Sequence, residues 1–509
     1  MSPTPSADRY SRRQTVANAR WFLLGKLLSA AATVLYLGLL TRALLPQGQL
    51  APYLAAIAWL ETTLALSLFG LDWLLIRHLP QAAQHDPSGL RRLLRAALLA
   101  RLGLALLAGL LLALVFVQLG RPVALDGVAL ALLALLLCSE SLLRLLRDTT
   151  LESLAAQRHT QLGVLGRSLL ALSGLGLLMA LGQPIDASTL LAVEATASLF
   201  MLGVVARWVR CALPPVPVAP PAVPAATSGL PEDNPGFPAA WRACLPNYLA
   251  ALISLPLAPQ SLTLALSHLV SPALLAPIGL CLRVFEVLRN YVPGLLLMNV
   301  LRPRLIGSHA QHGDFARTAT EAALISRWSA ISVAPLLAWL ALYGDMALAQ
   351  FAGQALMPGS GLMLALMAAS LLLRVHRQVG QVMVNIAGQQ ALLVRLALVG
   401  LLGLPLAHLC LQQGWPTWAL PLALGVDELA WVIGLSIGMR AWPHQLGFMA
   451  LLLLLAAGAA AIVAWLPLPA AWPGVLAGTA LLPVLMLGVL ALLGQLDWRP
   501  LRHALRRGD

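Results

Sequence analysis

Charged residues are scarce in this sequence, and lysine is almost absent. Asp, Glu, Lys and Arg make up 10% of the 509 residues, whereas about 25% is usual in soluble domains. Hydrophobic residues make up 59%, and the mean hydropathy is +0.82. This composition excludes an ordinary soluble protein and indicates a chain that lies mostly in a lipid bilayer.

The usual motifs of catalysis and metal binding are also missing. The chain has no GxxxxGK[ST] loop for ATP, no HExxH and no DxD. Its five cysteines form no CxxC pair, and its ten histidines are scattered without metal-ligand spacing. No outside loop is long enough to fold into a catalytic domain. We therefore predict a protein that is not an enzyme and that has neither a cofactor nor a metal site.

Long apolar runs are what the sequence has in abundance. Runs of about 20 residues, enough to cross about 30 Å of hydrocarbon as helix, recur along the whole chain. They predict an all-α polytopic membrane protein with about fourteen transmembrane helices. The predicted spans are 21–42, 52–76, 94–118, 123–146, 160–182, 187–208, 244–267, 272–300, 321–343, 359–386, 390–411, 416–438, 445–466 and 474–494.

The net charge of +13 would suggest nucleic acid in a soluble protein. Here the basic residues lie in short loops between apolar runs, so membrane topology explains them and no nucleic-acid partner is expected. With the N-terminus in the cytoplasm, the outside loops hold only Arg121, with Arg42 at the border. The positive-inside rule therefore predicts both termini in the cytoplasm. The long first apolar run predicts an uncleaved span.

A Pro-rich stretch, residues 214–238, lies between the sixth and seventh spans. Proline at this density cannot form a helix and favours extended structure. We predict a cytoplasmic linker at 209–243 that follows six spans, at 1–208, and precedes eight. A shift of 225 residues superimposes Glu61 and Arg77 on Glu286 and Arg302. This spacing hints at a duplicated unit, a common plan in transporters.

The eighth predicted span carries Arg283, Glu286 and Arg289. At 100° per residue they share one arc of about 120° with Asn290. A charge that faces lipid is costly, so this face should contact protein or a water-filled cavity. Two interpretations stay open: an ion pair that fixes helix packing, and the polar wall of a substrate cavity.

A second cationic cluster, Arg374, His376 and Arg377, lies in the tenth span. Arginine suits a phosphate because its planar fork can donate to two oxygens. If the cavity accepts an anionic headgroup, these arginines become candidate contacts. The candidate substrate-binding residues are Arg283, Arg289, Arg374, Arg377 and Arg42.

Two regions resemble a known family. Asn18 and Trp21 open the first span, Thr41-Arg42 close it, and GLDWLLIR closes the second. These features resemble the start of polysaccharide transporters, the Wzx-type O-antigen and exopolysaccharide flippases of the multidrug/oligosaccharidyl-lipid/polysaccharide (MOP) exporter superfamily. The stretch LRVFEVLRNYVPGLLLMNVLRPRL is similar to their eighth span.

The resemblance implies two six-helix lobes in a V, at 1–208 and 244–440, with two further helices in 441–509: a MATE-like fold. It implies alternating access that moves an oligosaccharide on polyprenyl diphosphate across the bacterial inner membrane, from inner to outer leaflet. The product would serve cell-surface or exopolysaccharide synthesis. Candidate partners are membrane lipid, H+ or Na+, and the polysaccharide polymerase and chain-length proteins. The candidate coupling or ion-pair carboxylates are Glu61, Glu286 and Asp427.

Three alternatives stay open. A lipid II flippase of the same superfamily usually has an arginine cluster in span one, where this chain has Lys26 and the terminal Arg42. A multidrug antiporter usually has twelve spans, often with a carboxylate in the first, and residues 21–42 contain none. A membrane glycosyltransferase, ligase or polymerase usually has a long outside loop, which is not predicted here. No motif encodes the identity of the sugar.

Overall fold

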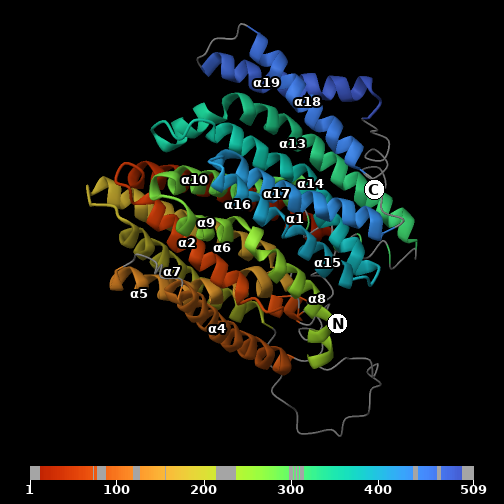
Figure 1. Cartoon of the computed structure of the whole chain (residues 1–509). Coiled ribbons are helices and arrows are strands. Elements are labelled where there is room, and N and C mark those ends of the chain that lie inside the picture. The colour runs from red at the N-terminus through yellow and green to blue at the C-terminus, as the bar shows by residue number, and fades with distance from the viewer. Residues whose placement is uncertain are drawn as a thin grey trace. The chain divides into compact units, whose positions relative to one another are not determined.

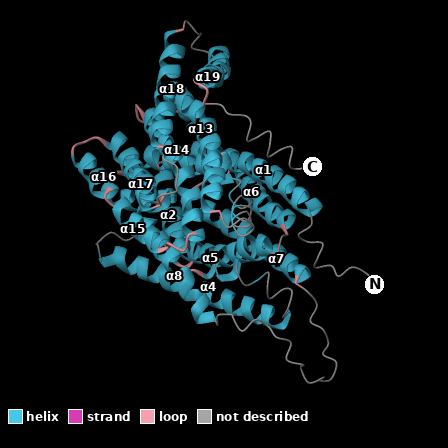
Figure 2. Cartoon of the chain, turned by 90° about the vertical axis from the view of Figure 1, so that its right-hand side faces the viewer, coloured by secondary structure: helices cyan, strands magenta, loops and turns pink. Residues whose placement is uncertain are grey.

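The computed structural model describes residues 12–72, 74–76, 79, 87–118, 126–154, 156–213, 237–296, 298, 302, 305, 309, 314–439, 445–466 and 472–495. Throughout this described part the chain is helical, without a strand, and Figures 1 and 2 show helices joined by turns and loops. The chain forms two compact units, residues 1–279 and 280–509.

The described part of unit 1 contains eight α-helices and the start of a ninth. The helices are α1 (Arg12–Leu44), α2 (Leu50–Leu66), α4 (Pro87–Gln118), α5 (Gly127–Arg144) with a π-helical turn (Leu145–Leu151), α6 (Gln157–Ala180), α7 (Ala187–Ala212), α8 (Phe237–Ser254), α9 (Pro259–Leu269) and the first residues of α10 (Pro272–Tyr291). A buried leucine-rich cluster joins α4, α5 with the turn that follows it, and α7.

Unit 2 contains the rest of α10 and the remaining labelled helices. In Figure 1, α13 and α14 run side by side, and they make the most extensive helix–helix contact in the structure. The helices are α11 (Pro293–Leu296), α13 (Phe315–Ala352), α14 (Ser360–Ile386), α15 (Ala391–Gly400), α16 (Gly403–Gln412), α17 (Pro416–Gly438), α18 (Leu446–Trp465) and α19 (Trp472–Leu492).

The helices match the predicted spans. Twelve helical segments of the described chain are long and apolar enough to cross a membrane. The other two predicted spans are α2, a shorter apolar helix, and α10, which carries three charged residues. The all-α polytopic fold is confirmed. The proposed lobes divided at 209–243 stay a prediction, and most of that linker lies outside the described residues.

The second span is interrupted near its middle. Helix α2 ends at Leu66, and Phe69 and Gly70 have φ of +44° and +78° before helical residues resume. Side chains from other helices satisfy the carbonyl groups that the break leaves without helical partners. Arg101 of α4 donates to a carbonyl in the last turn of α2 at 3.0 Å, and Tyr248 of α8 donates to the carbonyl of Leu66 at 3.0 Å. A break inside a membrane is tolerated where such partners exist.

In unit 2, a pair of glycines sets the contact between α13 and α14. A Cβ at Gly344 would lie 2.8 Å from the Cα of Gly361, and a Cβ at Gly361 would overlap the backbone of Gly344 and Asp345. The carboxylate of Asp345 also accepts a hydrogen bond from the backbone N–H of Gly361 at 2.7 Å. Only glycine allows this approach, because any Cβ would push the two backbones apart.

We predict that Gly361→Ala lowers the free energy of unfolding by about 1–3 kcal/mol, the usual cost of overpacking a tight contact. Thermal unfolding in detergent would show this as a lower midpoint temperature. Gly425→Ala in α17 is the matched control, because nothing lies within 4 Å of the added Cβ. Equal midpoints for Gly361→Ala and the wild type would contradict the packing argument.

Candidate functional site

A chain of ion pairs crosses the core of unit 1. Arg144 of α5 donates from its two Nη atoms to both carboxylate oxygens of Glu61 on α2, at 2.8 and 2.6 Å. Its Nε donates to Glu140 of the same helix at 3.0 Å. Arg167 of α6 contacts Glu140 and donates to Glu194 of α7 at 3.0 Å. The chain therefore links four helices through alternating charges.

Neutral side chains complete the hydrogen bonding of the buried carboxylates. The hydroxyl groups of Tyr36 and Tyr53 both donate to one oxygen of Glu194, at 3.0 and 2.5 Å. Ser198 donates to Glu140 at 2.5 Å. Both glutamates are buried: Glu140 is 1% exposed and Glu194 is 7% exposed. A buried network satisfied in this way fixes the helices around it, since each charge would be costly without its partners.

Unit 2 has its own cluster, on α14 and α17. Arg374 donates to Glu428 at 2.5 Å, and Arg377 donates to Asp427 and Glu428 at 2.6 and 3.1 Å. The guanidinium of Arg377 lies 4.2 Å from the ring centroid of Trp431, a cation–π contact. All but Arg374 are buried. Two arginines and two acids thus form a closed, charge-balanced group.

Helix α10 adds three charged side chains to this cluster. Arg283 donates to Glu286 at 2.9 Å. Arg289 is half-buried, and its charge interacts with those of Arg374 and Arg377. The acids within electrostatic range of Arg289 are Glu286 and Glu428, but no ion pair or hydrogen bond joins Arg289 to any described residue.

The charge balance of this unit 2 cluster follows from these contacts. Four guanidinium groups face three carboxylates, which leaves one positive charge in excess. Arg289 is the member without a direct partner in the described chain. Because its neighbours include two further arginines, an anionic ligand would gain attraction from several guanidinium groups at once.

The structure divides the predicted site residues between the units. Arg283, Arg289, Arg374 and Arg377 lie in the unit 2 cluster, together with the predicted carboxylates Glu286 and Asp427. The other two lie in unit 1: Glu61 is part of the ion-pair chain, and Arg42 is exposed in the last turn of α1.

Sequence reasoning misses five members of these clusters as site residues: Glu140, Arg144, Arg167, Glu194 and Glu428. The spacing of Glu140 and Arg144, four residues apart, is a usable signal because such pairs meet on a helix. In the described part of the chain no three His, Cys, Asp or Glu side chains are placed to hold a metal ion.

Comparisons with known proteins show the fold. No family model matches the sequence, and no curated protein is similar to it in sequence. Among solved structures, it is similar to the lipid II flippase MurJ in an inward closed conformation, with a TM-score of 0.57 and 10% identity over 96% of this chain and 99% of that one.

Two transporters are similar as well. An inward-facing multidrug resistance MATE family transporter of the MOP superfamily has a TM-score of 0.56 and 15% identity, covering 82% of this chain and 94% of that one. The MATE multidrug transporter DinF-BH, in a ligand complex, has a TM-score of 0.60 and 14% identity, covering 87% and 98%. The chain therefore has the fold of the MATE transporters and of MurJ, and is a multi-pass membrane protein.

We predict that Glu140→Gln destabilises the protein by about 3–5 kcal/mol, because it removes the buried charge that faces Arg144 and Arg167. The matched control is Glu321→Gln, which weakens the solvent-exposed pair with Arg317. That change should cost less than about 1 kcal/mol. Thermal unfolding of both variants in detergent measures the difference. Equal stability of the two variants would show that the unit 1 chain contributes little to folding.

Proposed function

We propose that this protein is a flippase for an oligosaccharide carried on polyprenyl diphosphate, and that the unit 2 cluster binds the diphosphate. The observation that carries the proposal is Arg289, a half-buried guanidinium in a membrane helix without a direct partner in the described chain. A charge there is costly unless it has a function or a ligand. The guanidinium fork suits phosphate oxygens, which accept two parallel hydrogen bonds.

The neighbouring ion pairs suggest how binding could drive movement. A diphosphate at Arg289 would compete with Glu286 for Arg283, and with Glu428 for Arg374. Each exchange replaces one anionic partner by another, so the guanidinium groups stay paired while the carboxylates lose a partner. A freed carboxylate in the membrane would then take up H+ or Na+, which gives Glu286 its proposed coupling role and adds Glu428 as a second candidate. Asp427 keeps its partner Arg377 in this exchange.

The charge of the unit 2 cluster supports a flippase over a drug transporter, whereas the fold is common to both classes. An excess positive charge favours an anionic substrate and disfavours a cationic drug. Lipid II is therefore the second candidate substrate, and the drug antiporter is the less favoured alternative.

We also propose the bacterial inner membrane as the location, with both termini in the cytoplasm. Cys211, exposed near the end of α7, then faces the cytoplasm. We predict that a membrane-impermeant maleimide leaves the wild type unlabelled in intact spheroplasts and labels it in inside-out vesicles. Gln47→Cys, in the exposed turn between α1 and α2, should be labelled in spheroplasts. If the wild type is labelled in spheroplasts and Cys211→Ser abolishes this labelling, then Cys211 faces the outside and the predicted topology is wrong.

We predict that Arg289→Ala lowers the flipping rate at least about tenfold, because one charge-assisted contact to phosphate contributes about 1.5–3 kcal/mol. The assay uses purified protein in vesicles that contain a polyprenyl-diphosphate oligosaccharide. An external glycan-cleaving enzyme reports how much of the inner-leaflet pool becomes accessible with time. Arg317→Ala, which removes an exposed arginine in the first turn of α13, is the control and should retain the wild-type rate.

Three results would contradict this account. A wild-type flipping rate in Arg289→Ala would be consistent with flippase activity but would show that Arg289 of the unit 2 cluster does not bind the substrate. Faster movement of lipid II than of other carriers would make lipid II the substrate. Movement of no lipid carrier, with export of organic cations against a proton gradient, would make the protein a drug antiporter.

A further inference from the structure

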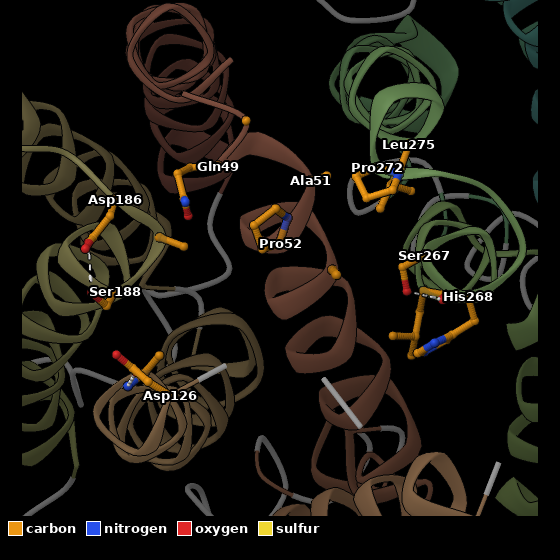
Figure 3. Close-up of a pocket in the computed structure, with 15 residues that line it drawn as sticks. Gln49, Ala51, Pro52, Asp126, Asp186, Ser188, Ser267, His268, Pro272 and Leu275 are labelled. Carbon is orange, nitrogen blue, oxygen red and sulfur yellow. Dashed lines mark hydrogen bonds between the residues drawn. The ribbon is translucent and has the colours of Figure 1, made fainter. Parts of the chain in front are cut away.

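A cavity of about 580 Å³ opens in unit 1, at one end of its helices (Figure 3). It is lined by the turn that precedes α2, the starts of α5 and α7, the end of α9 and the start of α10. The positive-inside topology puts all these helix ends on the outer side of the membrane. None of its lining residues belongs to the ion-pair chain or to the unit 2 cluster.

Two aspartates line one side of the cavity, and each uses only one carboxylate oxygen within the described structure. Oδ1 of Asp126 accepts from the backbone of Ala129 at 2.7 Å. Oδ1 of Asp186 accepts from Ser188 at 2.8 Å and from the backbone and hydroxyl of Thr189 at 2.7 Å. The bonds from Thr189 hold the pKa of Asp186 below its ordinary value, so it stays ionised at neutral pH. Both Oδ2 atoms remain as acceptors for a ligand.

The other side of the cavity has polar side chains and apolar surface. Figure 3 places Ser267 and His268 across α2 from the two aspartates, and Gln49 above the start of α2. The His268 ring stacks on Phe116 with centroids 4.3 Å apart, which fixes its orientation. Apolar surface comes from Pro52, Ala55, Pro272 and Leu275.

This mixture of groups selects among ligand classes. Two carboxylates repel a phosphate, which excludes the diphosphate headgroup. The described residues have no three-member His, Cys, Asp or Glu group for a metal ion. Sugar hydroxyls both donate and accept, and sugar rings have C–H faces that pack on apolar carbon. The volume falls within the about 300–1,000 Å³ typical of small-ligand sites.

We propose that this cavity binds sugar rings of the lipid-linked oligosaccharide on the outer side of the membrane. The proposal rests on the proposed function and on the predicted topology. It assigns the headgroup and the sugars to different residues: arginines of unit 2 hold the diphosphate, whereas Asp126 and Asp186 accept hydrogen bonds from sugar hydroxyls. Sugars far from the diphosphate, and not the first one, would then depend on the cavity.

The double variant Asp126→Asn, Asp186→Asn tests this with little risk to folding. Asparagine is as good a helix cap as aspartate, so the starts of α5 and α7 keep their hydrogen bonds. The second oxygen, however, becomes an NH2 group that donates instead of accepting. Asp314→Asn is the matched control, because Asp314 caps α13 in the same way, by accepting from the backbone of Arg317 at 3.1 Å.

The flipping assay then compares two carriers, polyprenyl diphosphate with a chitotetraose chain and the same lipid with a single N-acetylglucosamine. The double variant should move the tetrasaccharide carrier at least about tenfold more slowly, since two hydrogen bonds are lost. It should move the monosaccharide carrier at the wild-type rate, and Asp314→Asn should move both normally. An equal effect on both carriers, or none on either, would overturn the proposal.

Hydrogen–deuterium exchange separates this inference from the proposed function, because it needs no transport. Free chitotetraose or maltotetraose at millimolar concentration should slow exchange in residues 47–56 and 186–190 of the wild type but not of the double variant. If these residues are protected from exchange but no carrier is flipped, the sugar site is supported and the flippase function is contradicted. Protection by neither sugar, or by an organic cation dye alone, would overturn the sugar site.

Discussion

The cost of a charge in hydrocarbon is the constraint on which the rest of this structure depends. Each arginine in the core of a span must face a carboxylate, a carbonyl group or a ligand. In unit 1 this requirement joins Glu61 and Arg144 across two helices, and the chain continues through Arg167 to Glu194. Arg101, 2% exposed, meets the same requirement at the broken end of α2. Charge pairing therefore links α2, α5, α6 and α7 in unit 1, whereas apolar surface alone would allow many arrangements.

The same plan recurs in the second half of the chain. Counted along the sequence, the charged partners of unit 1 lie on spans two, four, five and six, and those of unit 2 on spans eight, ten and twelve. Two of these positions, Glu61 and Glu286, are those that the 225-residue shift superimposes. The halves differ in balance, because unit 2 includes Arg289 without a direct partner in the described chain. This difference makes unit 2 the better candidate for an anionic headgroup.

The sequence predicted the spans well, because each is an apolar run whose length the bilayer fixes. Helical periodicity also placed Arg283, Glu286 and Arg289 on one face, since that depends only on local geometry. The sequence could not predict the break after Leu66. The residues that stabilise this break, Arg101 and Tyr248, come from helices distant in the chain. Nor could it show that Arg167 bridges two glutamates on other helices, since such pairing is a property of tertiary packing.

The central claim is that Arg289, which has no direct partner in the described part of the chain, binds a diphosphate headgroup. The most direct measurement is the equilibrium binding of polyprenyl diphosphate, without sugar, to the purified protein, compared between the wild type and Arg289→Gln. The account predicts that affinity falls at least about tenfold in the variant, in line with the loss of one charge-assisted contact. It also predicts that affinity in the wild type falls as salt is raised. Equal affinity of the two proteins for polyprenyl diphosphate would contradict the account.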